Sequence, residues 1–438
     1  MTVGGLRRVA ALAILASLAA LAVEPALAQE AAKTPTLDKG DTAWMLTSTV
    51  LVLLMIVPGL ALFYGGLVRT KNMLSLLTQV LAVTCVVALV WPIYGYSLAF
   101  TESSPIIGGT EKLFLRTIAP DTLNGTIPEL VFVFFQMTFA AITTALVLGG
   151  IVERVKFFGV VLFAILWVSL VYVPIAHMVW GTGGYLLALG ALDFAGGTVV
   201  HINSGIAALV GALIVGKRVG FGKEAMPPHS LTLTMVGGVL LWVGWFGFNA
   251  GSALSANGTA ALAMANTFVA TAAAGLSWMF LEWMSKGKPS LLGLISGVIA
   301  GLVAVTPAAG FAGPMGAIFL GLIAGAVSLF FCTTVKNALG YDESLDVFGI
   351  HAVSGIVGSI LTGVLVSESL GGVGGIKDYN MASQVVTQIT AVAIAIAWSA
   401  IGTLVIFGIL KVIGLRPATD AEREGLDLTD HGERAYNY

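Results

Sequence analysis

Two histidines with matching neighbours are the residues of this 438-residue chain best suited to chemistry. One segment starts at His201 and the other at His351, and both read His-x-x-Ser-Gly-Ile. Each lies in an apolar run long enough to cross a bilayer. An ionisable group at that depth is costly, and it is interpreted first as part of a substrate or proton pathway. The pair therefore predicts conduction of something small and titratable.

Two other interpretations of the histidines are available. They could be satisfied core imidazoles that bridge two helices, although an apolar residue would pack there at lower cost. They could also bind zinc, but four ligands are usual for zinc. No Cys, Asp or Glu accompanies the histidines in the middle of these runs, so neither a metal nor another cofactor is predicted.

Aromatic side chains share single helix faces in two other apolar runs. Phe135 and Phe139 are four residues apart, a spacing that places them on one face. Trp245, Phe248 and Ser252 follow i, i+3, i+7, again one face. Packing against lipid would explain either set alone. The second run, however, puts polar side chains beside aromatic rings, and aromatic faces attract ammonium-type cations.

Asp193 lies just before the apolar run that contains His201. It could cap the free N–H groups at the start of that helix, or it could take a direct part in transport. Both roles are compatible, because a fixed carboxylate at an outer mouth also favours a nearby cation. Asp346, before the second histidine run, is interpreted as the counterpart of Asp193.

Composition identifies the elements that must position these residues as membrane helices. The chain is 57% hydrophobic and 10% charged, whereas soluble domains carry about 25% charged residues. A net charge of −2 and the lack of any basic stripe argue against a nucleic-acid partner. Cys85 and Cys332 fall inside predicted spans, so they suggest neither a disulfide nor a metal site.

A helix that crosses a bilayer needs about 20 mostly apolar residues. On that basis the sequence predicts eleven spans, near 43–68, 74–99, 128–152, 157–179, 197–216, 230–254, 260–284, 290–309, 313–335, 347–367 and 383–413. The histidine motifs fall in spans five and ten and therefore run in opposite directions. We expect an all-α integral membrane protein built as an inverted repeat of two five-helix halves plus a last long helix.

The ends of the chain and its basic residues predict an orientation. Residues 1–28, with Arg7 and Arg8, an apolar stretch over 9–23 and Ala-Leu-Ala at 26–28, resemble a cleaved signal peptide, with a first membrane helix as the alternative. Of 21 Lys and Arg residues, 14 then fall on the side of the C-terminal tail and 5 on the other side. The positive-inside rule predicts a plasma (inner) membrane protein with a periplasmic mature N-terminus and a cytoplasmic tail.

These residues together resemble the ammonium transporter/Rhesus family in its bacterial form. The matching segments are 63–67 (Phe-Tyr-Gly-Gly-Leu), 135–139, 174–180, 193–197, 245–252 and 348–351, and the resemblance covers essentially the whole mature chain. It implies a homotrimer of eleven-helix protomers over residues 29–414, each with its own pore, rather than an enzyme.

The resemblance also implies roles for individual residues. Substrate recruitment is assigned to an outer site, the gate to a stacked pair below it, and the remaining residues to the pore lining. The recruitment residues are Trp180, Phe139 and Ser252, with Asp193 nearby; the gate is Phe139 and Phe248; the pore is lined by His201, His351, Trp245 and Phe135. The tail, 415–438, reads alone as a solvated terminus, but the likeness implies a regulatory segment across the trimer's inner face. It further implies docking of a PII-type signal protein.

The residue types suit ammonium for an energetic reason. Moving a small cation out of water costs tens of kcal/mol in an apolar medium, and a desolvated cation–π contact returns only about 2 kcal/mol. Aromatic rings can therefore concentrate ammonium at a wet mouth, while neutral ammonia is the species expected to pass the gate. Potassium has no proton to lose, so it is excluded. A histidine pair makes separate proton transfer plausible.

Three other functions compete with transport. A sensor could use the same pore to bind ammonium, although such proteins often carry an appended signalling domain. An electroneutral Rhesus-type gas channel is a second, but Trp180 and Ser252 at the mouth favour the ammonium branch. An intramembrane enzyme is a third, and the spans show no nucleophile–base pair or metal set.

Overall fold

The protein is a bundle of long apolar helices. The computed structural model describes residues 36–437, so the predicted signal peptide lies outside the described residues. Within residues 36–437, eleven helices are long and apolar enough to cross a membrane: Lys39–Leu67, Thr70–Phe100, Glu129–Ile151, Phe157–Ala188, Gly197–Val215, Leu231–Gly251, Gly258–Lys286, Leu291–Ala308, Pro314–Leu339, Phe348–Leu365 and Met381–Val412. Each coincides with a predicted span, and the predicted fold class is confirmed.

The first five spans and their connections contain most of the irregular elements, where η marks a short π- or 3₁₀-helical segment. In chain order these are α2 (Lys39–Leu54), η1 (Met55–Leu60), α3 (Ala61–Leu67), η2 (Thr70–Asn72), α4 (Met73–Val90), η3 (Trp91–Gly95), α5 (Tyr96–Phe100), η4 (Leu113–Leu115), β1 (Leu123–Asn124), β2 (Ile127–Pro128), α6 (Glu129–Ile151), α7 (Phe157–Trp167), η5 (Val168–Tyr172), α8 (Val173–Trp180), α9 (Tyr185–Ala188), η6 (Gly197–Ile202) and α10 (Asn203–Val215). The two short strands pair antiparallel.

The remaining six spans and the tail complete the chain. They are α11 (Leu231–Gly251), α12 (Gly258–Lys286), α13 (Leu291–Val305), η7 (Thr306–Ala308), α14 (Pro314–Phe330), η8 (Phe331–Val335), α15 (Lys336–Leu339), η9 (Phe348–Ala352), α16 (Val353–Leu365), η10 (Glu368–Leu370), α17 (Met381–Val412), α18 (Thr419–Glu424) and α19 (Leu426–His431).

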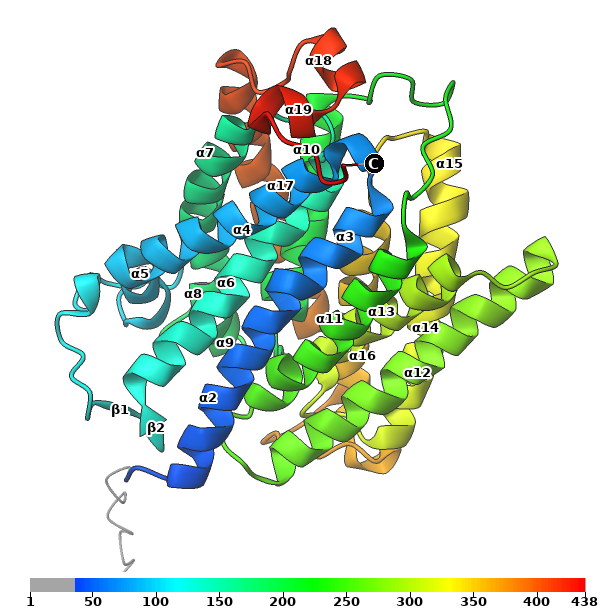
Figure 1. Cartoon of the computed structure of the whole chain (residues 1–438). Helices are drawn as coiled ribbons and strands as arrows, with labels where there is room; N and C mark the ends of the chain where they lie inside the picture. The colour runs from blue at the N-terminus through cyan, green and yellow to red at the C-terminus, as the bar shows by residue number, and fades with distance from the viewer. Residues whose placement is uncertain (1–35, 438) are drawn as a thin grey trace, which may run out of the picture.

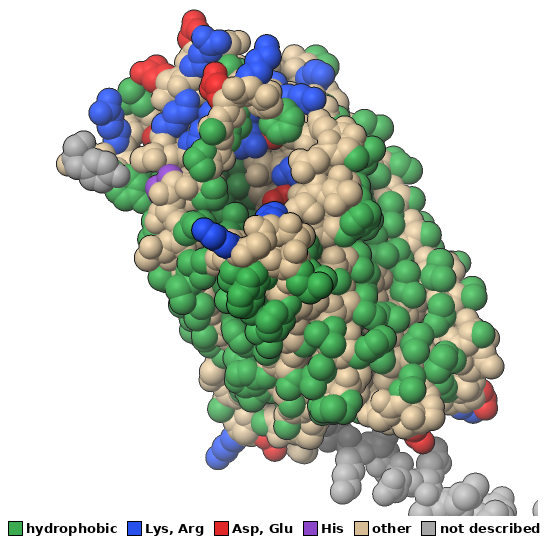
Figure 2. All heavy atoms as spheres, turned by 90° about the vertical axis from the view of Figure 1, so that its right-hand side faces the viewer, with side chains coloured by type: hydrophobic (Ala, Val, Ile, Leu, Met, Phe, Trp, Pro, Cys, Tyr) green, Lys and Arg blue, Asp and Glu red, His purple; other side chains and the backbone are tan. Residues whose placement is uncertain are grey.

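The two ends of the described chain lie at opposite faces of the bundle (Figure 1). An odd number of crossings requires this. The tail helices α18 and α19 cover one face, here named the C-terminal face, while α2 starts at the other, here named the opposite face, beside β1 and β2 (Figure 1). Lys and Arg side chains gather at the C-terminal face, where the surface is also hollowed (Figure 2).

The tail is packed against the C-terminal face through its acidic side chains. Asp427 accepts hydrogen bonds from the backbone N–H groups of Leu74 (3.1 Å) and Ser75 (2.7 Å), and so caps α4. Asp430 accepts from Phe157 N–H at the start of α7 (2.8 Å), and Glu422 accepts from Val219 N–H (2.6 Å). The interpretation of this segment as a solvated terminus is therefore wrong for the described part of the tail.

Candidate functional site: a line of aromatic and histidine side chains

The two histidine helices run antiparallel and touch where their glycines allow it. A Cβ added to Gly205 would lie 2.4 Å from the backbone nitrogen of Ala352. A Cβ added to Gly355 would lie 3.2 Å from the carbonyl oxygen of Gly197 and from Cβ of His201. Small residues thus let the helix backbones approach closely. Because the helices cross around the motifs, both imidazoles lie between the two faces of the bundle.

The crossing brings the two imidazoles into direct contact. The Nδ1 atoms of His201 and His351 are 3.2 Å apart, and both side chains are buried. A neutral imidazole carries one N–H donor and one acceptor nitrogen. One Nδ1 must therefore carry a proton and the other must not, so the two neutral rings are opposite tautomers. The two rings exchange tautomers when that proton moves to the other Nδ1 while Nε2 of the first ring gains a proton and Nε2 of the second ring loses one; this is the elementary step of a relay.

Trp245 fixes the orientation of His201. The two rings stack with centroids 5.3 Å apart and planes at 20°. Nε1–H of Trp245 donates to Oγ1 of Thr306 (2.9 Å), which holds the indole in place. Nε2 of His201 has no hydrogen-bond partner. An acceptor or donor on a small guest could satisfy it.

A stacked pair of phenylalanines lies next to the histidines, on the side toward the opposite face. The rings of Phe139 and Phe248 lie 4.0 Å apart at 16°, and both are buried. Phe135 meets Phe139 edge-on at 4.9 Å, while Phe248 lies 6.0 Å from the ring of His201. No charged or hydrogen-bonding side chain belongs to the stack itself. The stack is therefore an apolar barrier between the histidines and the opposite face.

A small aromatic cavity of about 190 Å³ opens on the far side of that barrier. Its wall is formed by Phe100, Phe132, Gln136, Phe139, Trp180, Phe194, Ser252 and Leu254. Trp180 meets Phe139 edge-on at 5.9 Å. The hydroxyl of Ser252 donates to the carbonyl of Phe248 (2.8 Å), so its oxygen lone pairs can still accept from a guest. Aromatic faces with a hydroxyl oxygen suit a small N–H-bearing cation.

Several residues of this cavity were not predicted from the sequence. Phe132 and Gln136 precede Phe139 by seven and three positions, so they lie on its helix face. That spacing is a signal that could have identified them. Phe194 carries no such signal, because it reaches the cavity from a loop. Thr306, which lies outside this cavity and holds Trp245 from another helix, carries none either. Their position depends on the tertiary structure.

Asp193 does not line the aromatic cavity. Its carboxylate accepts hydrogen bonds from the N–H groups of Gly196, Gly197 and Thr198 (2.8, 2.6 and 2.8 Å), from Val199 N–H and from the hydroxyl of Thr198. Its carbonyl accepts from Nε1–H of Trp180 (2.9 Å). This geometry is that of a helix cap that also holds the cavity's tryptophan.

The counterpart of Asp193 in the second half is Glu343, so the interpretation of Asp346 as the counterpart is wrong. Glu343 accepts from the N–H groups of Val347 (3.0 Å) and Phe348 (3.3 Å) at the start of η9. Asp346 instead pairs with Lys336 at 2.5 Å. The sequence did carry a signal, since Asp193 and Glu343 each precede their histidine by eight residues.

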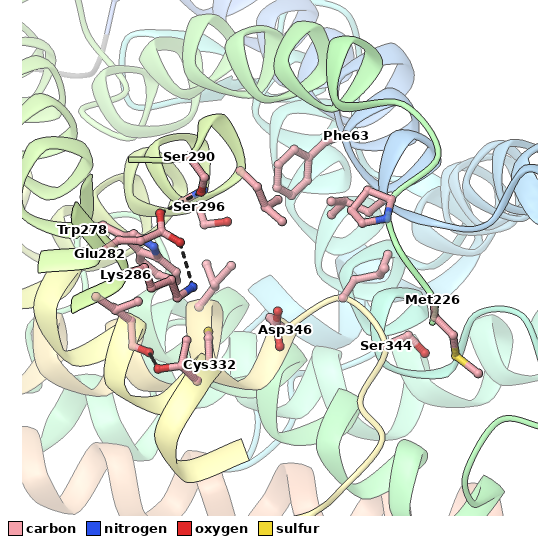
Figure 3. Close-up of a pocket in the computed structure, with 18 residues that line it drawn as sticks. Phe63, Met226, Trp278, Glu282, Lys286, Ser290, Ser296, Cys332, Ser344 and Asp346 are labelled. Atoms are coloured by element: carbon pink, nitrogen blue, oxygen red, sulfur yellow. Dashed lines mark hydrogen bonds and ion pairs between the residues drawn. The ribbon is translucent and has the colours of Figure 1, made fainter. Parts of the chain in front are cut away.

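A wider cavity of about 260 Å³ opens at the C-terminal face, below the histidines. Ile350, the neighbour of His351, contributes to its wall, together with Phe63 and Leu345. Figure 3 shows Glu282 beside Lys286 and Ser290, whereas Phe63 comes from another side. Glu282 pairs with Lys286 (2.9 Å) and accepts from the Ser290 hydroxyl (2.7 Å). The cavity is thus polar toward solvent and apolar toward the histidines.

Paired charges join the loops at the C-terminal face next to segments that line this cavity. Arg218 bridges Glu153 (3.1 Å) and Asp342 (2.7 Å), and Arg69 also pairs with Glu153 (2.8 Å). Burial by itself would raise the pKa of Glu153, but Arg218 and Arg69 hold that pKa below its ordinary value. The carboxylate therefore stays ionised, and ion pairs hold these loops together.

A membrane bundle with this line of side chains can be compared with known proteins. A model of the Ammonium Transporter Family matches residues 43–436. The chain belongs to this family. It is therefore a member of a transporter family and not of an enzyme family, as the resemblance implied.

Relatives in the ammonium transporter family cover nearly the whole chain. The ammonium transporter of Aquifex aeolicus is 51% identical over 93% of this chain and 95% of its own length. The solved structure of a sensor Amt protein has a TM-score of 0.84 at 28% identity, over 90% of this chain and 98% of that chain. The structure of Saccharomyces cerevisiae Mep2 has a TM-score of 0.80 at 36% identity, over 88% and 91%.

Proposed function

We propose that this chain transports ammonium by recruiting the cation at the aromatic cavity and conducting ammonia past the histidine pair. Trp180, Phe139 and Ser252 bind ammonium, Phe139 and Phe248 form the gate, and Phe135 and Trp245 line the pore. The observation that carries the proposal is the 4.0 Å stack of Phe139 on Phe248. It separates a cavity suited to a cation from a polar pair suited to a neutral, hydrogen-bonding guest.

Ammonium is deprotonated at the gate because the cation gains too little there to offset the loss of its water. A cation in the aromatic cavity keeps part of its water and gains about 2 kcal/mol from a desolvated cation–π contact. That gain is small against the desolvation cost of the ion in a buried phenyl stack. Ammonia loses far less on leaving water, and it can bond to the histidine nitrogens beyond. Selectivity against potassium then follows from proton loss rather than from size.

The proton released at the gate crosses separately in this proposal. The contact between the two Nδ1 atoms supports a relay in which tautomers exchange. Asp193 supports recruitment indirectly, because it holds Trp180 and caps the helix of His201. Ammonia leaves through the cavity at the C-terminal face, where it regains a proton.

We further propose the cellular arrangement that the family resemblance suggests. The protein is a homotrimer in the inner membrane, with residues 1–28 cleaved as a signal peptide, a periplasmic mature N-terminus and a cytoplasmic C-terminal face. The tail, 415–438, is regulatory, and a PII-type signal protein docks on this face. The gathering of Lys and Arg at the C-terminal face supports this orientation.

The first experiment is electrical. Purified protein is reconstituted in liposomes, and the current is recorded after a pulse of ammonium, with an equal pulse of potassium as control. An ammonium-specific current that falls at least tenfold in the His201→Ala and His351→Ala variants supports the proposed mechanism. Wild-type rate and potassium exclusion in both variants would contradict the role of the histidines.

Two other outcomes distinguish the remaining functions. No current, with a luminal pH rise faster than in empty liposomes, identifies an electroneutral ammonia channel. Neither signal, together with saturable ammonium binding to the purified protein, identifies a sensor. The structural similarity to a sensor Amt protein makes this second measurement worthwhile.

A further inference from the structure

We propose that Gln388, on the last membrane helix, is a positioning residue for the pore. Its side chain is 1% exposed and belongs to none of the cavities described above. The inference rests on the proposed function, since it concerns how the proposed pore keeps its geometry. It is carried by three hydrogen bonds that tie α17 to the loop before the His201 helix and to the helix that follows His351.

The Gln388 amide clamps one loop residue from both sides. Its Oε1 accepts from Leu192 N–H (2.7 Å), and its Nε2 donates to the Leu192 carbonyl (2.8 Å). A second N–H of the same amide donates to the carbonyl of Ser359 on α16 (2.7 Å). These partners fix the orientation of the amide, because the reverse orientation would face N–H against N–H. Both ends of the amide therefore have backbone partners, and Oε1 also accepts a longer hydrogen bond from Nε2 of Gln384 (3.4 Å).

Both ends of the clamp lead to residues of the pore. Leu192 is joined to Asp193, whose carboxylate caps the helix of His201 and whose carbonyl holds Trp180. Ser359 is on α16, about two turns after His351, which is in η9. A Cβ added to Gly197 would lie 2.7 Å from Oγ of Ser359, so the start of one histidine helix rests on the other at this point.

Gln388 therefore sets how the two histidine helices are positioned relative to each other near the contact of Gly197 with Ser359. A further hydrogen bond also ties α17 to the His201 helix: the Ser399 hydroxyl donates to the carbonyl of Asn203 at the start of α10 (2.7 Å). Without the amide, two buried carbonyls and one buried N–H lose their partners, and the loop that carries Asp193 must move to reach others. Such movement changes the separation of the His201 and His351 rings without touching either.

The test compares two changes at Gln388 with a matched change one turn away. Gln384 lies on the same helix, is only half-buried, and donates to the carbonyl of Gly190 (2.9 Å) and, at 3.4 Å, to Oε1 of Gln388, so its removal leaves the bonds of Gln388 to Leu192 and Ser359 in place. Wild type, Gln388→Met, Gln388→Glu and Gln384→Met are reconstituted in liposomes. For each, ammonium and potassium currents are measured at pH 6 and pH 8, after thermal stability and assembly are checked in detergent.

Gln388→Met should lower the ratio of ammonium to potassium current at least tenfold at both pH values, whereas Gln384→Met should stay within twofold of wild type. In Gln388→Glu the carboxyl accepts from Leu192 N–H in either state but donates only when protonated. Its current relative to wild type should therefore be at least threefold higher at pH 6 than at pH 8. Because an ionised carboxylate can also destabilise the fold, thermal stability of Gln388→Glu is measured at both pH values, and the current ratio is compared where the protein is equally folded.

The inference is overturned if folded Gln388→Met keeps the wild-type current and selectivity, or if the Gln388→Glu deficit is equal at both pH values. If Gln388→Met does not fold, the pH dependence of Gln388→Glu decides. A wild-type protein without any ammonium-specific signal would overturn the proposed function itself, and this inference with it. The wild-type control thus separates the two failures.

Discussion

At the scale of single residues, buried acids and histidines act through hydrogen bonds to their neighbours. Asp193 and Glu343 each accept hydrogen bonds from the free N–H groups at the start of a histidine helix. Such groups need a partner, because a buried backbone N–H without one costs about 1–3 kcal/mol. The two imidazoles, in turn, must be opposite tautomers to share a hydrogen. The chemistry of the pore thus depends on polar groups that are almost fully satisfied.

Replacing Asp193 by Asn tests the capping role. The amide keeps one acceptor oxygen but turns an NH2 group toward the N–H groups of Thr198 and Val199. We expect the free energy of unfolding to fall by about 2–4 kcal/mol, measured by denaturation in detergent. Asp121→Asn, on an exposed loop, is the control. Unchanged stability with a weaker apparent affinity for ammonium would instead assign Asp193 to recruitment.

Glu343 should make stability depend on pH. Burial, with a smaller contribution from Asp346, raises its pKa from 4.5 to about 7 against the opposing charge of Lys336. Between pH 4.5 and 7 the folded state holds a proton that the unfolded state has lost, so stability falls as pH rises through this window. The change has an upper bound of about 3 kcal/mol. Glu343→Gln should make the unfolding temperature nearly independent of pH between pH 5 and 7.5. An unchanged slope of unfolding temperature against pH would exclude Glu343 as the titrating group.

At the scale of elements, the decisive contact is the crossing of the spans Gly197–Val215 and Phe348–Leu365, where α10 packs on η9 and α16 packs on η6. Helices carrying larger residues could not approach so closely, and the imidazoles would then be out of hydrogen-bond reach. Glycine at the contact is needed here for space and not for a left-handed backbone. The continuous helix α17 holds the two histidine helices together through hydrogen bonds of Gln388 and Ser399.

Gly205→Ala should separate the two helices, because the new Cβ would lie 2.4 Å from the backbone nitrogen of Ala352. We expect at least a tenfold lower ammonium current. Gly408→Ala in α17 is the matched control: its Cβ would meet nothing within 4 Å, and alanine stabilises a helix interior by up to about 1 kcal/mol over glycine. Equal currents in the two variants would show that the contact at Gly205 does not set the pore geometry.

At the scale of the whole molecule, the tail links elements that are far apart in the chain. Asp427 caps α4, Asp430 caps α7, and Glu422 binds the loop before α11, so one short segment fastens three parts of the C-terminal face. Changes in that segment can therefore reach the helices around the pore. This is the physical basis for a regulatory tail.

Asp427→Ala should release the tail, because two N–H groups at the start of α4 lose their acceptor. The buried side chain of the neighbouring Leu426 is then held less firmly. We expect trypsin to cut at Arg423 at least fivefold faster than in wild type, measured by mass spectrometry of the fragments that begin at Glu424, because a cut at Arg434 would also remove a C-terminal tag. Asp420→Ala, on the exposed side of α18, is the control. Equal cleavage rates for both variants and wild type would mean that Asp427 does not hold the tail.

The sequence by itself determined the eleven spans, the opposed histidine helices and the family. Spans follow from composition, because a bilayer demands some 20 apolar residues per crossing, and this signal is local. The motif at an odd spacing of spans likewise implied an inverted pair. The spacing of eight residues from Asp193 to His201 and from Glu343 to His351 was also present, although Asp346 was chosen instead.

Only the tertiary structure decided which side chains meet. The stack of Phe139 on Phe248 joins α6 and α11, the Trp245–Thr306 bond joins α11 and η7, and Gln388 reaches a loop 196 residues away. Helix faces can be read from periodicity, but the partner of a face cannot, because every membrane helix is apolar over most of its surface. Close approach at glycines and the pairing of buried polar groups select the partners, and both are properties of the assembled bundle.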